Sequence, residues 1–147
     1  LKDKTKVKQI AYNSFINSRF HLDKRLSKKI VNKLKSQWIS NFFHNKRGDW
    51  MILFEVNKKV EGFVLLLKEK KNLIIDLIAV SKKFQRKGIA TSMIGFANYY
   101  FNKKFRFLIV GTQANNVQSI KFYKNLGFKS FSKKSVFHYY KRRKKTK

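Results

Sequence analysis

The segment Leu73–Val80 is apolar at every position except Asp76, and it constrains the fold more than any other part of the chain. A strand with one solvated face alternates apolar and polar residues, whereas a nearly continuous apolar run is typical of a strand covered on both faces. The run is also too short to cross a bilayer as a helix, which takes about 20 residues. The sequence therefore predicts a central β-strand with other layers packed against both of its faces.

Two further apolar runs, Trp50–Val56 and Gly62–Leu67, precede this strand. Polar turns at residues 57–59 and 68–72 separate the three runs. Strands that are joined by such short turns pair in the antiparallel sense. The sequence therefore predicts an antiparallel meander of three strands.

Helical periodicity marks the first third of the chain and two later segments. Residues 19–23 separate two amphipathic stretches whose apolar residues recur at helical spacing: Val7, Ile10, Ala11 and Phe15, then Ile30, Val31, Leu34, Trp38 and Phe42. After Val80 we expect a helix from about Gly88 to Phe101, a strand at Phe105–Gly111, a helix from about Asn116 to Leu126 that Gly127 ends, and a last strand near Val136–Tyr140. This order predicts an α/β (α+β) fold, a mixed and mostly antiparallel central sheet flanked by helices.

The domain organisation follows from length and composition. A chain of 147 residues is the size of one domain, and no linker rich in Pro, Gly or Ser divides it. We therefore expect a single domain over residues 1–140, followed by a basic C-terminal tail at residues 141–147.

The chain is strongly basic, with 36 Lys and Arg against 7 Asp and Glu and a net charge of +29. Such a field attracts nucleic acid, anionic lipid or phosphorylated small molecules. The alternative is a biased overall composition, because the Lys residues are spread along the whole chain, whereas nucleic-acid-binding proteins usually gather them on one surface.

Few residues are suited to metal binding. There is no Cys, and the spacing of His21, His44 and His138 is not that of metal ligands, so we expect no metal. The longest apolar runs are of strand length, so we expect no transmembrane segment and a cytoplasmic location.

The loop after the central strand, Gln85-Arg86-Lys87-Gly88-Ile89-Ala90, carries the chemistry. Gly88 opens the following helix, whose unpaired N–H groups and positive end favour an anion such as phosphate. Gly88 lets the backbone approach that anion closely, and Arg86 and Lys87 add positive charge. A glycine after a strand is also often only a turn.

Two motifs in this sequence resemble those of the GNAT superfamily of N-acetyltransferases. The first is an apolar strand, Leu77-Ile78-Ala79-Val80, followed by the loop Gln85–Ala90. The second is Asn116 ahead of a helix that ends in Phe122-Tyr123-Lys124-Asn125-Leu126-Gly127-Phe128. Both occur in the family order and spacing, and together they span roughly residues 73–128.

This resemblance implies acetyl-CoA as the cosubstrate and assigns residues to it. The loop residues Gln85, Arg86, Lys87, Gly88, Ile89 and Ala90 would bind its pyrophosphate, the strand edge Ile78, Ala79 and Val80 would pair with its pantetheine amides, and Asn116 would touch it. Ala90 stands where the family more often has Gly, and the family's usual first strand is absent before the helix at Val7.

The same resemblance makes Tyr123 the general acid that faces the departing thiolate. A free Tyr has a pKa near ~10 and a thiol ~8.5, so complete proton transfer is uphill, and we expect a strong hydrogen bond instead. A core aromatic residue is the alternative reading of Tyr123.

Asp76 is the candidate base for the incoming amine. Strand alternation would place it on the face of Ile78 and Val80, where burial would raise its pKa toward that of a useful base. A structural, salt-bridged Asp is an equal alternative, with ordered water taking the proton.

The segments Asn17–His21 and Gly111–Asn116 look like those of bacterial acetyltransferases that modify dTDP-linked amino-dideoxysugars. That resemblance would place Arg19, Phe20 and His21 at the acceptor pocket, with Arg19 near a diphosphate. A structural role at a helix end, a peptide acceptor and a nonenzymatic nucleic-acid-binding module stay as alternatives, and a homodimer is left open.

Overall fold

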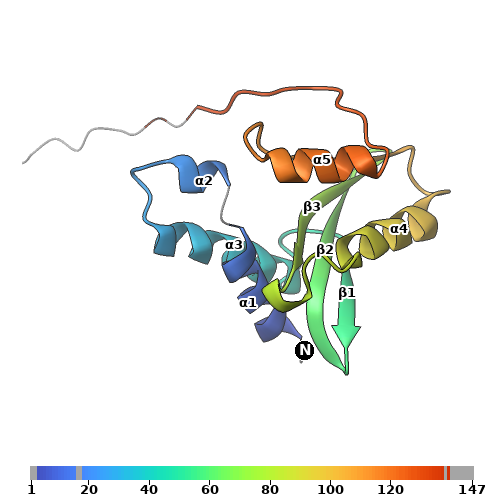
Figure 1. Ribbon diagram of the computed structural model, residues 1–147, viewed down its shortest axis with the longest axis horizontal. Coiled ribbons are helices and arrows are strands. Elements are labelled where there is room, and N and C mark those ends of the chain that lie inside the picture. The colour runs from blue at the N-terminus through green and yellow to red at the C-terminus, as the bar shows by residue number, and fades with distance from the viewer. Residues whose placement is uncertain (1–2, 16–17, 138, 140–147) are drawn as a thin grey trace, which may run out of the picture.

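A four-stranded mixed sheet organises the part of the chain that the computed structural model describes, residues 3–15, 18–137 and 139 (Figure 1). Its strands are β1 (Trp50–Val56), β2 (Lys59–Glu69), β3 (Asn72–Val80) and β4 (Phe107–Val110), in the order β1-β2-β3-β4. The first three pair antiparallel, and β4 pairs parallel to β3. The mixed, mostly antiparallel sheet predicted from the sequence is therefore confirmed.

Helices cover both faces of this sheet (Figure 1). On one face lie α1 (Lys4–Ser14) and α3 (Lys28–Phe43), with the short α2 (Arg19–Leu22) beside α3. On the other lie α4 (Ile89–Phe101) and α5 (Val117–Asn125). A 3₁₀ turn, η1 (Lys82–Phe84), joins β3 to the loop before α4. Because both faces of β3 are covered, Leu73, Ile75, Leu77, Ala79 and Val80 are buried and Ile74 and Ile78 are partly buried, in keeping with the strand covered on both faces that the sequence predicted.

Each face has its own hydrophobic core. In α1 the buried residues Val7, Ile10 and Ala11 follow helical spacing and pack with Phe63, Leu65 and Leu77 of the sheet. In α4, the buried residues are Ile89, Met93, Ile94, Ala97 and Phe101, and they pack against Val64, Leu66, Leu73, Ile75 and Val80. Alternate residues of β2 thus serve opposite cores.

A β-bulge at Asp76 changes the faces of β3. Leu65 pairs with Leu77 and Leu66 pairs with Ile75, so Asp76 has no partner on β2. Ile75 therefore belongs to the α4 core, while Leu77 belongs to the α1 and α3 core. The prediction that Asp76 shares a face with Ile78 and Val80 stays a prediction, because simple alternation does not hold across the bulge; Asp76 and Ile78 both line the same cleft.

Residues 19–23 do separate two longer helices, and residues 19–22 among them form the short helix α2. One other predicted feature differs from the structure. The strand expected at Val136–Tyr140 is not formed: residues 136, 137 and 139 have no strand partner, and 138 and 140 lie outside the described residues. Val136, Phe137 and Tyr139 are all exposed there, so no core drives the segment onto the sheet.

The domain prediction for residues 1–140 stays a prediction, and the tail at 141–147 lies outside the described residues. Within the described ranges, no helix is both long and apolar enough to cross a membrane. The same ranges hold no cluster of His, Asp and Glu that fits a metal ion.

Candidate active site

Strands β3 and β4 part at their carboxyl ends and open a large cleft. Their ladder runs from the pair Asn72 and Phe107 to the pair Ile75 and Val110. Beyond that point β3 continues to Val80, but β4 ends and the chain turns away towards α5. The opened edge of β3 thus offers backbone groups that no strand of the described chain satisfies on that side. The cleft has a volume of about 1000 Å³.

Gln85, in the loop between η1 and α4, lines one end of this cleft. The Gln85 side-chain amide donates to the Val80 carbonyl over 3.0 Å, which ties the loop to the end of β3. Arg86 and Gly88 both have positive φ, 63° and 75°. A chain that turns through left-handed conformations in this way directs successive N–H groups into one concave surface, which suits an anion.

Gly88 caps the N-terminus of α4 and leaves space beside it. A Cβ added to Gly88 would meet nothing within 4 Å in the protein, so the backbone there is open to a ligand. Packing within the protein therefore does not require a glycine at position 88. The first N–H groups of α4 have no acceptor within the helix. Arg86 and Lys87 are exposed beside it.

Helix α5 and its N-cap residue supply Asn116, Gln118, Ser119 and Tyr123 to the cleft. The Asn116 side-chain oxygen accepts from the Ser119 N–H over 3.2 Å and so caps the helix. Tyr123 is 9% exposed, and its ring lies between those of Phe122 and Phe128. Burial raises the pKa of Tyr123 to about 12, because the phenolate would be poorly solvated.

Asp76 forms a bidentate ion pair with Arg47, from the loop before β1. Arg47 Nε donates to Asp76 Oδ2 over 2.7 Å, and its Nη2 donates to Oδ1 over 2.5 Å. The guanidinium of Arg47 also lies over the Trp38 ring, 4.3 Å from its centroid. Both oxygens of Asp76 are thus engaged, which is the salt-bridged alternative considered for this residue.

The acceptor residues predicted from the sequence have different positions. Phe20 lines the cleft, whereas His21 does not. His21 instead donates from Nε2 to Asn32 Oδ1 over 2.8 Å, and its Nδ1 lies 2.8 Å from the Ser18 hydroxyl, so it fastens α2 to α3. The side chain of Arg19 lies outside the described structure.

The cleft brings together the other predicted residues only in part. Asp76, Ile78, Gln85, Asn116 and Tyr123 line it, while Ala79, Val80 and the loop residues 86–90 lie beyond its wall. Sequence reasoning missed Phe15, Lys35, Trp38 and Arg47, which also line it. A signal existed for Lys35, since it stands between Val31 and Ile39 on the buried stripe of α3.

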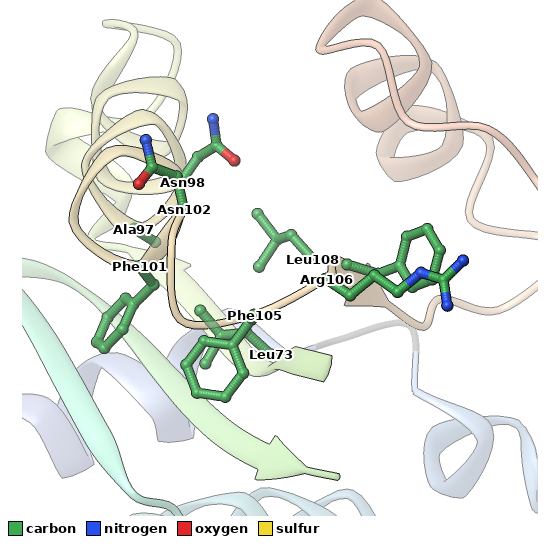
Figure 2. Close-up of a pocket in the computed structure, with 9 residues that line it drawn as sticks. Leu73, Ala97, Asn98, Phe101, Asn102, Phe105, Arg106 and Leu108 are labelled. Atoms are coloured by element: carbon green, nitrogen blue, oxygen red, sulfur yellow. The ribbon is translucent and has the colours of Figure 1, made fainter. Parts of the chain in front are cut away.

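A second, smaller hollow lies where the end of α4 meets β4 (Figure 2). Phe101, Phe105 and Leu73 form its apolar side, and Asn98 and Asn102 point away from them. At about 120 Å³ it is far below the few hundred Å³ that small-molecule sites usually have, so the large cleft is the candidate site.

The opened β3 edge, the loop before α4 and the helix of Tyr123 agree with a match to a family model. Residues 11–128 match the model described as "Acetyltransferase (GNAT) family". The chain belongs to the GNAT family of acetyltransferases. The fold of the family is likewise found among solved structures.

One relative of the chain is the spore coat polysaccharide biosynthesis protein SpsD of Bacillus subtilis (strain 168). It is 30% identical over 139 residues, which make up 94% of this chain but only 47% of SpsD. The chain thus spans about half the length of that relative.

Two solved structures of the family illustrate the shared fold. The ribosomal-protein-S18-alanine N-acetyltransferase of Escherichia coli aligns with a TM-score of 0.66 and 18% identity over 89% of this chain and 74% of its own. The PaiA N-acetyltransferase of Thermoplasma acidophilum, in complex with coenzyme A, aligns with a TM-score of 0.69 and 15% identity. The alignment covers 90% of this chain and 87% of that chain.

Proposed function

We propose that this protein transfers the acetyl group of acetyl-CoA to the amino group of a nucleotide-linked amino-dideoxysugar. The observation that carries the proposal is the cleft between β3 and β4, which extends from Gln85, in the loop before α4, to aromatic and cationic residues of α2, α3 and the loop before β1. A cosubstrate with a pyrophosphate and a second, anionic substrate fit such a cleft.

The cofactor end matches the chemistry of CoA. The open backbone at Gly88 and the start of α4 suit a pyrophosphate, and the unpaired edge of β3 at Ile78–Val80 suits the amides of an extended pantetheine chain. Gln85 holds the loop to the strand end, and Arg86 and Lys87 add charge. Acetyl-CoA supplies an acetyl group that its thioester activates towards an amine.

Tyr123 stands at the point where charge develops on sulfur. When the amine nitrogen bonds to the carbonyl carbon, the carbon–sulfur bond breaks and its electron pair stays on sulfur. The Tyr123 hydroxyl stays protonated at neutral pH, because its pKa is about 12, and it donates a hydrogen bond to that thiolate. Asn116, the N-cap residue of the same helix, orients the cosubstrate.

The amine must lose one proton during this transfer. Asp76 was the candidate base, but both of its oxygens accept hydrogen bonds from Arg47. We therefore assign Asp76 the task of holding Arg47 against Trp38, and water in the cleft takes the proton from the amine.

The acceptor is a nucleotide sugar in this proposal because several features agree. Phe20 lines the cleft, and so do two cationic side chains, Lys35 of α3 and Arg47 of the loop before β1. SpsD is named for polysaccharide biosynthesis, and polysaccharides are built from activated sugars.

Two experiments test the proposal in sequence. Isothermal titration at moderate salt should give saturable one-site binding for acetyl-CoA and no comparable binding for ATP, which controls for the attraction of phosphates to so basic a surface. A screen of acceptors should then give acetylated product from dTDP-amino sugars.

Other outcomes point elsewhere. Acetylation of peptides alone would replace the acceptor with a protein amine. Equal weak binding of acetyl-CoA and ATP, together with salt-dependent binding of nucleic acid, would favour a nonenzymatic module instead.

A further inference from the structure

The solvent-facing side of α4 carries exposed aromatic rings and no charge. Residues 88–102 contain no Lys, Arg, Asp or Glu, in a chain where 29% of the residues are charged. Phe96, Tyr99 and Tyr100 are 51%, 78% and 55% exposed, and their spacing of three and four residues places them on one side of the helix. These three residues form the α4 aromatic surface. Exposed apolar groups that are gathered in this way indicate a binding surface.

The α4 aromatic surface offers ring faces on which a planar group can stack. The Phe96 and Tyr100 rings are nearly parallel, with centroids 5.8 Å apart and planes at 16°. The Nζ of Lys104 lies 4.9 Å from the centroid of the Tyr100 ring, so a cation follows the rings along the helix. None of these side chains lines the cleft of the candidate active site.

Basic side chains gather where the α4 aromatic surface ends. The backbone N–H of Arg106, in the turn after α4, donates to the Lys71 carbonyl over 2.7 Å, so this turn lies beside the turn between β2 and β3. The two turns carry five exposed basic residues against the acidic Glu69: Lys70, Lys71, Lys103, Lys104 and Arg106. In the sequence, no Asp or Glu follows position 76. This end of the molecule therefore attracts anions.

We propose that the α4 aromatic surface and the basic turn after it bind single-stranded nucleic acid, as an activity separate from acetyl transfer. Bases stack on the exposed rings, and Lys103, Lys104 and Arg106 pair with the phosphates. Stacking of this kind needs unpaired bases, which a duplex does not offer. A lipid surface fits less well, because α4 exposes no large aliphatic side chain beside its rings.

Direct binding to the full chain tests the inference. A fluorescein-labelled oligothymidylate of about 10 nucleotides is titrated at moderate salt and followed by anisotropy. CoA is present at saturation, so that the loop before α4 is already filled. We expect saturable binding that is about tenfold tighter than binding of a duplex or of inorganic polyphosphate, since neither presents unpaired bases. Oligouridylate is titrated in parallel, and the tighter of the two strands identifies the preferred sugar.

Tyr99→Ala should weaken oligothymidylate binding by about tenfold without any change in net charge, as expected for the loss of one stacked base. The high exposure of Tyr99 means that folding should tolerate the change. Tyr12→Ala is the matched control. It removes an exposed tyrosine from α1, on the opposite face of the sheet, and should change the affinity less than about twofold (Figure 1).

The phosphate contacts have their own test. Lys104→Gln should reduce the slope of log affinity against log salt by about one, because one fewer counterion is released on binding. Lys33→Gln removes the same charge from an exposed site on α3, across the sheet, and should leave the slope unchanged.

Three results would overturn the inference. One is equal affinity of the Tyr99→Ala and Tyr12→Ala proteins for oligothymidylate, and another is equal affinity of the unaltered protein for oligothymidylate and polyphosphate. The third is a Tyr99→Ala protein that loses self-association, or binding to phosphatidylserine vesicles, while its oligothymidylate affinity is unchanged. That result would assign the α4 aromatic surface to a second copy or to a membrane.

The acetylation assay keeps this inference distinct from the proposed function. Tyr99-dependent binding of oligothymidylate without acetylation of any amino sugar would uphold the nucleic-acid surface and reject the proposed reaction. Acetylation of a dTDP-amino sugar by a protein that does not distinguish oligothymidylate from polyphosphate would uphold the reaction and reject the nucleic-acid surface.

Discussion

Tyr123 shows how burial sets the task that a single residue can perform. Its pKa of about 12 exceeds the ~8.5 of a thiol by several units, so full transfer of its proton to the thiolate is uphill by roughly 5 kcal/mol. A hydroxyl that holds its proton this firmly acts as a hydrogen-bond donor to developing negative charge. In the proposed reaction the contribution of Tyr123 is therefore electrostatic.

Tyr123→Phe should lower kcat by about 10 to 100-fold and leave the affinity for acetyl-CoA nearly unchanged, since it removes only that donor. Because Tyr123 stays protonated until the pH nears its pKa of about 12, the ratio of wild-type to variant kcat should be constant from pH 6 to pH 10. Rate measurements across this range test both points. An unchanged rate would remove Tyr123 from the mechanism.

The pair of Arg47 and Asp76 gives a second prediction at this scale. Asp76→Ala and Arg47→Ala should each destabilise the protein, and the double variant should show a coupling of about 1 to 3 kcal/mol in urea unfolding. Both single variants should lose acceptor binding to a similar degree, because each releases the other side chain.

A different result would restore Asp76 as the base. That role predicts a loss of kcat with Asp76→Ala and little loss with Arg47→Ala, once stability is accounted for. Additive effects of the two changes on unfolding would show that the ion pair contributes little.

At the scale of elements, the end of β3 and the start of α4 act as one unit. The bulge at Asp76 and the early end of β4 open an edge of β3, and the loop that follows brings the N-terminus of α4 to one end of the cleft. Gly88 joins the loop to α4, and its φ of 75° suits glycine far better than other residues.

Gly88→Val should reduce acetyl-CoA affinity at least about tenfold, because a branched side chain strains the left-handed backbone and intrudes on the ligand. Calorimetric titration of the folded variant measures this. Gly95→Ala is the control: Gly95 lies in the middle of α4 with open space around it, so Ala should bind the cosubstrate normally and raise stability by about 1 kcal/mol. Normal binding by a folded Gly88→Val protein would refute the loop assignment.

Over the whole molecule, the dominant feature is a net charge of +29 on 147 residues. Ion pairs such as those of Lys6 with Glu61 and of Arg47 with Asp76 can engage only a minority of the positive side chains, because the chain has 36 Lys and Arg against 7 Asp and Glu. Repulsion among so many like charges disfavours the compact state.

Raising NaCl from 0.05 to 0.5 M should therefore raise the Tm, by about 3 to 6 °C if screening recovers one to two kcal/mol. Thermal unfolding followed by circular dichroism measures the shift, and sucrose at equal osmolality controls for effects other than screening. A Tm that falls with salt would mean that attractive pairs outweigh the repulsion.

The sequence by itself determined the local elements and indicated the loop before α4. Local preferences depend on neighbouring residues and can therefore be predicted from the sequence. Examples are the apolar run at Leu73–Val80, the helical spacing in α1, α3 and α4, and the glycine that precedes α4. The order of strands and helices followed from them. The motifs around Gly88 and Tyr123 also lie in continuous segments, which is why they indicated the family.

Only the tertiary structure decided what depends on residues far apart in sequence. The bulge that turns Asp76 towards Arg47, the burial that raises the pKa of Tyr123 and the place of Lys35 among Phe15, Phe20 and Trp38 all arise from packing between elements. The predicted last strand failed for the same reason, since β-propensity at Val136–Tyr140 forms a strand only where an edge and a core receive it. Pairing and burial are properties of the assembled fold, so no local pattern records them.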